Sequence, residues 1–173
     1  MRGFFGVGVE GISKGANVGS LVRSTHAFGG SFFFTLGTDL DLDGIRASDT
    51  SDAFDHLPFY NFKTPDDLVL PAGVTLVGIE LTPDAIDLPS FRHPTRAAYI
   101  LGPEMGSLSP VMQQRCEFIV KIPTKFCVNV GVAGAIILYD RMISNGRFAA
   151  RPVRSGGPVA GMPDPLWMPR RKA

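Results

Sequence analysis

The chain has 173 residues, of which 45% are hydrophobic and 19% charged, and its formal net charge is +1. This length suits one domain with its own core, and two cysteines do not make the disulfide framework of a small secreted protein. No Cys/His cluster has metal-ligand spacing, no apolar run reaches the length of a membrane span, and the start lacks a signal-peptide run. We therefore expect a cytoplasmic protein that holds no metal and does not attach to membranes.

Charge is distributed unevenly along the chain. Residues 1–143 include 11 basic and 15 acidic residues, whereas residues 144–173 include 6 basic residues and one acidic residue. We therefore divide the chain into a domain over 1–146 and a basic, Pro/Gly-rich tail over 147–173. Such a tail can contact a phosphate backbone, and it can equally be a solvated terminus. Trp167 can stack on a base or pin the tail onto the domain.

Apolar runs alternate with helical patterns along the domain. We expect strands over 4–9, 31–36, 59–62, 74–80, 97–101 and 118–122. We expect helices over 17–28, 109–114 and 128–144, a short helix near 51–56, and a helical turn or two over 65–70. This alternation predicts an α/β fold, with a mostly parallel sheet and helices on both faces.

The first predicted helix combines an apolar stripe with two polar residues of interest. The stripe consists of Val18, Leu21, Val22, Thr25 and Phe28, which share one side of a helical wheel. Arg23 falls nearly opposite this stripe, so the helix can bury the stripe while Arg23 faces whatever lies above the ends of the strands. Asn17 is a good N-cap residue, and its amide can also bind a ligand. Both residues also have an ordinary interpretation, as a helix cap and a solvated side chain.

The last predicted helix, over 128–144, is apolar on all sides of its wheel. Its small residues, Gly131, Ala133, Gly134 and Ala135, allow another backbone to approach closely. One face of a sheet cannot cover such a helix in a small domain, so the sequence predicts a subunit interface here.

Three blocks in this order carry a family resemblance. The first runs from Asn17 through Arg23 to Gly29 and Gly30. The second is the strand 97–101 followed by Gly102-Pro-Glu104-Met-Gly106-Ser-Leu-Ser109, and the third is 118–123 followed by Thr124-Lys-Phe-Cys127-Val128-Asn129 and an apolar helix. Together they resemble the TrmH/SpoU family of SPOUT-class RNA 2′-O-ribose methyltransferases, over about residues 6–143.

The resemblance implies a function, a cofactor and partners. The function is methyl transfer from S-adenosylmethionine to the ribose 2′-hydroxyl of structured RNA, with tRNA favoured over rRNA. The protein would be a homodimer through its C-terminal apolar helix, and that part of the chain would form a trefoil knot, which ordinary connection rules disfavour. The implied cofactor contacts are Ile79, Gly102, Ile122, Cys127 and Val128. The implied catalytic residues are Asn17, Arg23, Glu104 and Asn129.

The roles of these catalytic residues stay open at this point. Arg23 acts either as the general base that the family often assigns or as a ligand of phosphate and of the growing negative charge. Glu104 has three candidate partners: a loop backbone, Asn17, or Arg23 of either subunit. Asn129 can orient ribose or cofactor, and it can cap the last helix.

The third block also departs from the family pattern. Cys127 and Gly131 stand where the family usually has serine, and the loop 123–129 is about three residues shorter than the common form. These departures sustain an alternative, a non-catalytic RNA-binding or assembly protein on the same scaffold. An unrelated nucleotide-binding enzyme is disfavoured, because the chain has neither G-x-G-x-x-G nor a phosphate-binding lysine loop.

Overall fold

The computed structural model describes residues 3–39, 41, 45, 52–149 and 151–157. Its strands are β1 (Phe4–Glu10), β2 (Phe32–Leu36), β3 (Phe59–Phe62), β4 (Thr75–Ile79), β5 (Ile86–Asp87), β6 (Arg96–Leu101) and β7 (Phe118–Lys121). They form one sheet in the order β3-β2-β1-β6-β4-β7-β5, and each pair of neighbours in it is parallel. The predicted parallel sheet is confirmed. The two-residue strand β5 was not predicted, since it is too short to leave a pattern.

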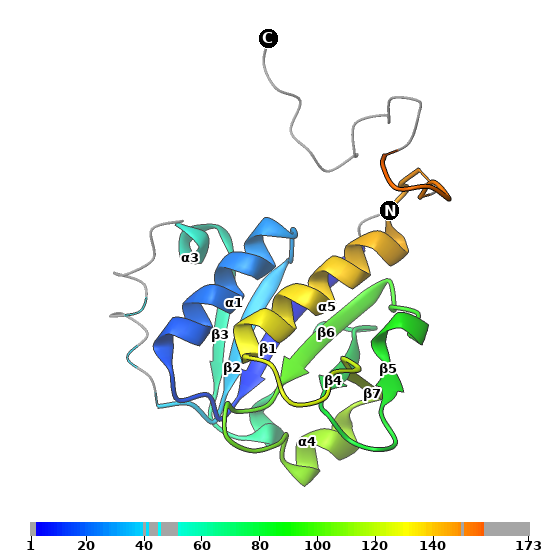
Figure 1. Cartoon of the computed structure of the whole chain (residues 1–173). Helices are drawn as coiled ribbons and strands as arrows, with labels where there is room; N and C mark the ends of the chain where they lie inside the picture. The colour runs from blue at the N-terminus through cyan, green and yellow to red at the C-terminus, as the bar shows by residue number, and fades with distance from the viewer. Residues whose placement is uncertain (1–2, 40, 42–44, 46–51, 150, 158–173) are drawn as a thin grey trace.

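Helices cover both faces of the sheet, as predicted. They are α1 (Gly15–Ala27), α3 (Ala53–His56), α4 (Pro110–Arg115) and α5 (Val130–Asn145), with 3₁₀ turns η1 (Pro65–Asp67) and η2 (Leu88–Ser90). Helices α1 and α5 lie side by side across one face (Figure 1). On the other face, Leu108 and Met112 at α4 pack against Phe34 and Ile100.

The three phenylalanines of β2 are shared between the two faces. Phe33 belongs to the core cluster under α1 and α5, whereas Phe32 and Phe34 belong to the cluster under α4. The rings of Phe32 and Phe34 fill the space above Gly6 and Gly8 of β1, where an added Cβ would lie 2.4 Å and 2.2 Å from ring atoms. Glycine in β1 therefore lets the neighbouring aromatic rings lie flat on the sheet.

Helix α1 begins two residues earlier than predicted. Its N-cap is Lys14, whose side chain makes no capping bond, so the prediction of Asn17 as the N-cap is wrong. Asn17 lies inside the first turn and is only 8% exposed. The predicted stripe is buried apart from Phe28, which is partly buried at the C-cap, and Arg23 is exposed.

Helix α5 is capped by Asn129, whose Oδ1 accepts hydrogen bonds from the backbone N–H groups of Gly131 (2.9 Å) and Val132 (3.3 Å). The capping interpretation of Asn129 is therefore confirmed. Farther along the helix, the buried Arg141 donates to the carbonyls of residues 94 and 95 and to the Tyr99 hydroxyl. These bonds fix α5 to the start of β6.

The chain covers α5 on one side. Val132 is 50% exposed and Tyr139 is 48% exposed, although the helix is apolar on all sides. The single chain therefore does not bury this helix on all sides, and the subunit interface predicted here stays a prediction.

Other sequence predictions fall partly outside the described residues. The described parts of the tail, 147–149 and 151–157, are exposed and contain no helix or strand, while Trp167, Arg170, Arg171 and Lys172 lie outside the described range. No helix in the described part is both long and apolar enough to cross a membrane. The described residues also include no group of three His, Cys, Asp or Glu side chains that could hold a metal ion. The trefoil knot stays a prediction.

Candidate active site

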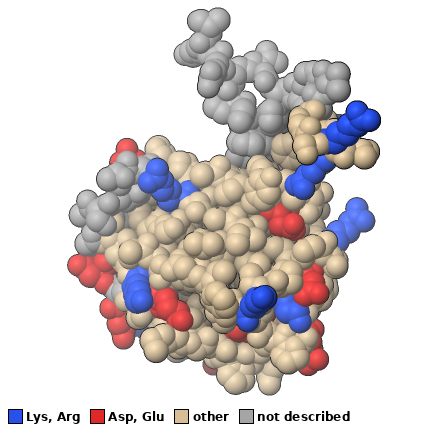
Figure 2. Space-filling view, in the orientation of Figure 1, with Lys and Arg blue, Asp and Glu red and all other residues tan. Residues whose placement is uncertain are grey.

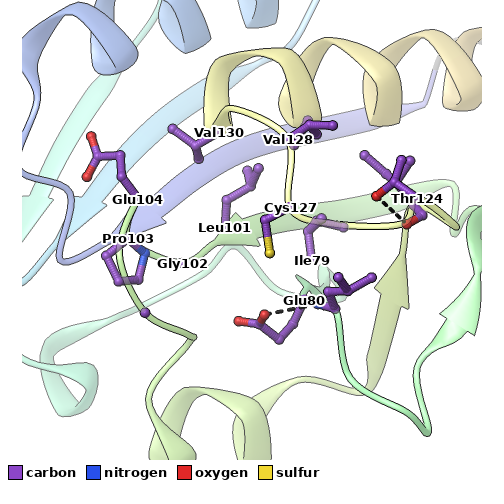
Figure 3. Close-up of a pocket in the computed structure, with 14 residues that line it drawn as sticks. Ile79, Glu80, Leu101, Gly102, Pro103, Glu104, Thr124, Cys127, Val128 and Val130 are labelled. Carbon is purple, nitrogen blue, oxygen red and sulfur yellow. Dashed lines mark hydrogen bonds between the residues drawn. The ribbon is translucent and has the colours of Figure 1, made fainter.

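A pocket lies at the carboxyl ends of β4, β6 and β7, between the loops that follow these strands (Figure 3). This is the edge at which open parallel sheets usually bind ligands. The structure places all the predicted cofactor contacts around it: Ile79, Gly102, Ile122, Cys127 and Val128. They come from three separate loops, so only the folded sheet brings them together.

The pocket combines apolar walls with negative charge. Ile79, Leu101 and Val130 supply apolar surface, and the side chains of Glu80 and Glu104 also line the pocket. Apolar walls suit a flat ring, and two carboxylates suit a positively charged group. S-adenosylmethionine has both features, an adenine ring and a cationic sulfonium, so the residues present fit this cofactor.

Glu104 joins the second sequence block to the first. Its carboxylate accepts hydrogen bonds from the backbone N–H groups of Ser13 (3.2 Å) and Lys14 (3.1 Å), the Ser13 hydroxyl (3.1 Å) and the Asn17 amide (2.8 Å). Of the three partners considered for Glu104, the loop backbone and Asn17 are therefore the ones observed. This carboxylate binds the chain that enters α1, which explains why the helix begins before Asn17.

The same hydrogen bonds change the acidity of Glu104. Partial burial opposes the charged form of the carboxyl, but the hydrogen bonds from Asn17, from its own backbone and from Ser13 outweigh that effect. Together they lower the pKa of Glu104 from 4.5 to about 2. Glu104 is therefore a carboxylate at neutral pH, with no proton to donate.

Asn17 and Asn129 extend this network to the third block. The Nδ2 of Asn129 donates to the Oδ1 of Asn17 at 3.0 Å, and the Nδ2 of Asn17 donates to Glu104. The start of α1, the start of α5 and the loop after β6 are thus held together by side-chain hydrogen bonds. We call Asn17, Glu104 and Asn129 the motif network. Its members fix the loops around the pocket.

Arg23 does not join the motif network. It lies eight residues beyond Gly15 on α1, about 12 Å along the helix axis at 1.5 Å per residue. Its side chain is exposed and does not line the pocket. Within the described residues, its guanidinium makes no hydrogen bond or ion pair, so it is available to bind an anion.

Two carboxylates that sequence reasoning missed also shape the site. The Oε2 of Glu80 accepts from the backbone N–H of Leu108 at 2.8 Å, and Glu10 accepts from the backbone N–H (2.8 Å) and the hydroxyl (2.6 Å) of Ser109. Both hold the far end of the loop after β6. Their signal in the sequence was an acidic residue directly at the end of an apolar strand.

Two glycines are required by close packing at the site. A Cβ on Gly102 would lie 2.9 Å from the backbone nitrogen of Leu108, so a side chain there would displace the loop. A Cβ on Gly131 would lie 2.9 Å from the Oγ of Ser20. The glycine that departs from the family pattern at position 131 thus lets α1 and α5 approach closely.

The chain is similar to known methyltransferases in both sequence and structure. The chain is 25% identical over 138 residues to the mouse (Mus musculus) tRNA (guanosine(18)-2′-O)-methyltransferase TARBP1, covering 75% of this chain and 9% of that protein. Its structure resembles the SpoU methyltransferase AviRb from Streptomyces viridochromogenes in complex with the cofactor AdoMet. The TM-score is 0.74 and the identity 22%, covering 83% of this chain and 61% of that one.

A second solved structure has the same fold. It is the A. aeolicus TrmH/SpoU tRNA modifying enzyme, with a TM-score of 0.70 and 19% identity, covering 81% of this chain and 74% of that one. At these identities the structural likenesses establish the fold. The family model for the SpoU rRNA Methylase family matches residues 5–139, which is most of the chain. The chain therefore belongs to the SpoU rRNA Methylase family.

Proposed function

We propose that this chain transfers a methyl group from S-adenosylmethionine to a ribose 2′-hydroxyl of structured RNA, and that tRNA is favoured over rRNA. The observation that carries the proposal is the motif network, which joins all three sequence blocks beside one pocket. The preference for tRNA rests on TARBP1 and the A. aeolicus enzyme, which are named for tRNA. AviRb and TARBP1 are both much longer than the matched region.

The cofactor site would be formed by Ile79, Gly102, Ile122, Cys127 and Val128. Bound S-adenosylmethionine supplies a methyl group made electrophilic by the cationic sulfur. The apolar walls would hold the adenine ring, and backbone groups of the three loops would bind its polar edge. The negative charge of Glu80, which lines the pocket, would favour the cationic sulfur.

Arg23 would act on the RNA. A guanidinium is not deprotonated in proteins, so a role as general base is chemically difficult. It binds phosphate oxygens through two parallel N–H groups, and it stabilises negative charge that grows on an attacking oxygen. Because its guanidinium makes no hydrogen bond or ion pair among the described residues, Arg23 can do both.

The partner that brings Arg23 to a pocket would be a second copy of the chain. A groove between α1 and α5 is lined by Ser20, Ser24, Phe28, Val132, Ala135 and Tyr139. The centre of this face carries few charged side chains, and Lys and Arg lie around its edge (Figure 2). We propose that two chains pair through this apolar face. Arg23, next to Ser24, would then lie at the pocket of the other subunit.

The proposal is tested with labelled S-adenosylmethionine and unmodified bulk tRNA or rRNA. The wild-type protein is expected to label one of the two RNAs. Arg23→Ala is expected to lose a factor of about 10² to 10³ in kcat, as when one donor to a developing oxyanion is removed. Its affinity for S-adenosylmethionine, measured by calorimetry, should stay at the wild-type value. If wild type neither labels RNA nor binds the cofactor, the chain is a binding protein and the proposal is wrong.

A further inference from the structure

Phe126 is an exposed aromatic side chain in a loop that borders the pocket. It is 75% exposed, although phenylalanine is among the residue types most often buried. It lies in the loop after β7, in which Ile122, Thr124, Cys127 and Val128 line the pocket. The cofactor contacts proposed above do not include it.

The loop holds Phe126 in place by its own hydrogen bonds. The backbone N–H of Thr124 donates to the carbonyl of Ile122 at 2.7 Å, and the Thr124 hydroxyl donates to the carbonyl of Phe126 at 2.8 Å. These two hydrogen bonds therefore fix the backbone of the turn on both sides of Lys125. A surface held in this way loses little conformational entropy when a ligand binds.

The surroundings of Phe126 indicate what kind of ligand it meets. Lys125 beside it is exposed and carries a positive charge. Across the pocket, the loop after β6 carries Met105, which is 94% exposed and stands between the pocket residues Glu104 and Gly106. Figure 3 shows these two loops on opposite sides of the pocket. The two loops that border the pocket thus each carry an exposed apolar side chain, and one of them also carries a cation.

We propose that Phe126 is the platform on which a base of the substrate RNA stacks, with Lys125 contacting the adjoining phosphate. This inference rests on the proposed function. A ribose inside a folded RNA must leave its stacked position to present its 2′-hydroxyl to a pocket. Stacking on an aromatic ring replaces the contacts that its base loses, and it does so for any base.

The face of the molecule on which Phe126 lies favours RNA over a second subunit. The apolar groove that we assign to the dimer lies between α1 and α5, and Phe126 does not line it. Phe126 belongs instead to the loop that borders the proposed cofactor pocket, beside the pocket residues Thr124 and Cys127.

The test measures binding of the RNA that wild type methylates, either unmodified bulk tRNA or rRNA. Dissociation constants are taken over a series of KCl concentrations with S-adenosylhomocysteine present. The variants are Phe126→Ala, Phe126→Trp and Lys125→Ala. Tyr60→Ala is the matched control, because Tyr60 is a half-exposed aromatic residue on the edge strand β3.

Loss of stacking and loss of a phosphate contact have different salt signatures. We expect Phe126→Ala to weaken RNA binding by about 5- to 150-fold at every salt concentration, with an unchanged salt slope. Lys125→Ala should lower the slope by about one unit. Phe126→Trp should bind like wild type, since tryptophan also offers a ring face. Tyr60→Ala should bind like wild type, because it lies outside the site.

Several results would overturn the inference. One is wild-type RNA affinity in Phe126→Ala together with normal methylation, in which case the proposed function stands and the platform fails. Another is weakened calorimetric binding of S-adenosylmethionine, which would assign Phe126 to the cofactor. A third is a changed sedimentation coefficient, which would assign it to the subunit interface. If the wild-type protein neither methylates nor binds tRNA or rRNA, the proposed function and this inference both fail.

Discussion

The carboxylate of Glu104 has a structural role, since it holds the chain segment that enters α1 against the loop after β6. Four donors from Ser13, Lys14 and Asn17 bind it, and Asn17 is in turn bound by Asn129. In these contacts, and in the helix cap that Asn129 makes, every side-chain oxygen and nitrogen of the two asparagines and of Glu104 forms at least one hydrogen bond. Of the residues that the resemblance implies as catalytic, Arg23 is therefore the one whose charged group makes no hydrogen bond or ion pair within the described part of the chain.

Glu104→Gln should destabilise the protein by about 1 kcal/mol at pH 7, because a neutral amide accepts these bonds more weakly at a partly exposed position. Since the folded pKa lies at about 2, below the ordinary value of 4.5, the stabilisation is complete above about pH 4.5. It is lost as the pH falls through about 2. Urea unfolding at pH 7, 4 and 2.5 should therefore show the difference from wild type shrinking with pH. Glu117→Gln, at an exposed position, is the control. A pH-independent difference would contradict this account of Glu104.

Arg23→Lys separates two roles of a positive charge. If the guanidinium binds a phosphate and the ribose oxygen through its planar set of N–H groups, lysine should lose most of the activity, close to the loss in Arg23→Ala. Its free energy of unfolding should change by less than about 0.5 kcal/mol, since the side chain is exposed and makes no hydrogen bond or ion pair with the described residues. Initial rates of methyl transfer provide the measurement. Activity near wild type in Arg23→Lys would show that a point charge suffices.

The packing of α1 against α5 is tightest at Gly134. A Cβ on Gly134 would lie 2.2 Å from Cδ2 of the fully buried Leu21, whereas a Cβ on Gly19 would meet Ile45 at an ordinary 3.9 Å. Gly134→Ala should thus destabilise by about 1–3 kcal/mol through overpacking. Gly19→Ala, the same change in the neighbouring helix, should stabilise by up to about 1 kcal/mol through helix propensity. Urea midpoints measure both. Equal effects of the two changes would contradict the close contact.

At the scale of elements, local pattern determined most of the fold. The long apolar strands and the stripe of α1 were predicted because each signal lies within a dozen residues. The start of α1 was not, because it is set by Glu104, which lies some 90 residues farther along the chain. For the same reason Glu10 and Glu80 were missed, since their partners at Leu108 and Ser109 come from a distant loop. The residues around the pocket were located through the family motifs, as periodicity alone does not identify them.

At the scale of the whole molecule, two features of the single chain bear on the proposed dimer. The outer face of α5 exposes Val132 and Tyr139, and Arg23 lies away from the pocket of its own subunit. The dimer proposed above, a two-fold pairing through α1 and α5 in which each pocket receives the arginine of the other chain, would account for both features.

Val132→Asp should therefore convert the dimer to monomers, because an unpaired carboxylate in an apolar interface costs several kcal/mol. Sedimentation velocity measures the mass. Val69→Asp is the control, as Val69 is 75% exposed and does not line the α1–α5 groove. A dimer that persists in Val132→Asp would place the interface elsewhere.

Mixed dimers test whether Arg23 acts across the interface. Arg23→Ala and the pocket variant Gly102→Ala should each be inactive alone. Refolded together in equal amounts, they should regain about a quarter of the wild-type activity, since half of the dimers then contain one complete site. No recovery would place Arg23 and its pocket in the same chain.

The most direct test of the central claim is to locate the methyl group on the RNA. After reaction with labelled S-adenosylmethionine, bulk tRNA is digested in alkali, which cleaves next to every free 2′-hydroxyl. We predict that the label appears in alkali-resistant dinucleotides, because a methylated 2′-oxygen cannot attack the adjoining phosphate. Label in mononucleotides from tRNA and from rRNA alike would mean that a base is methylated, and it would contradict the assignment of this site to ribose chemistry.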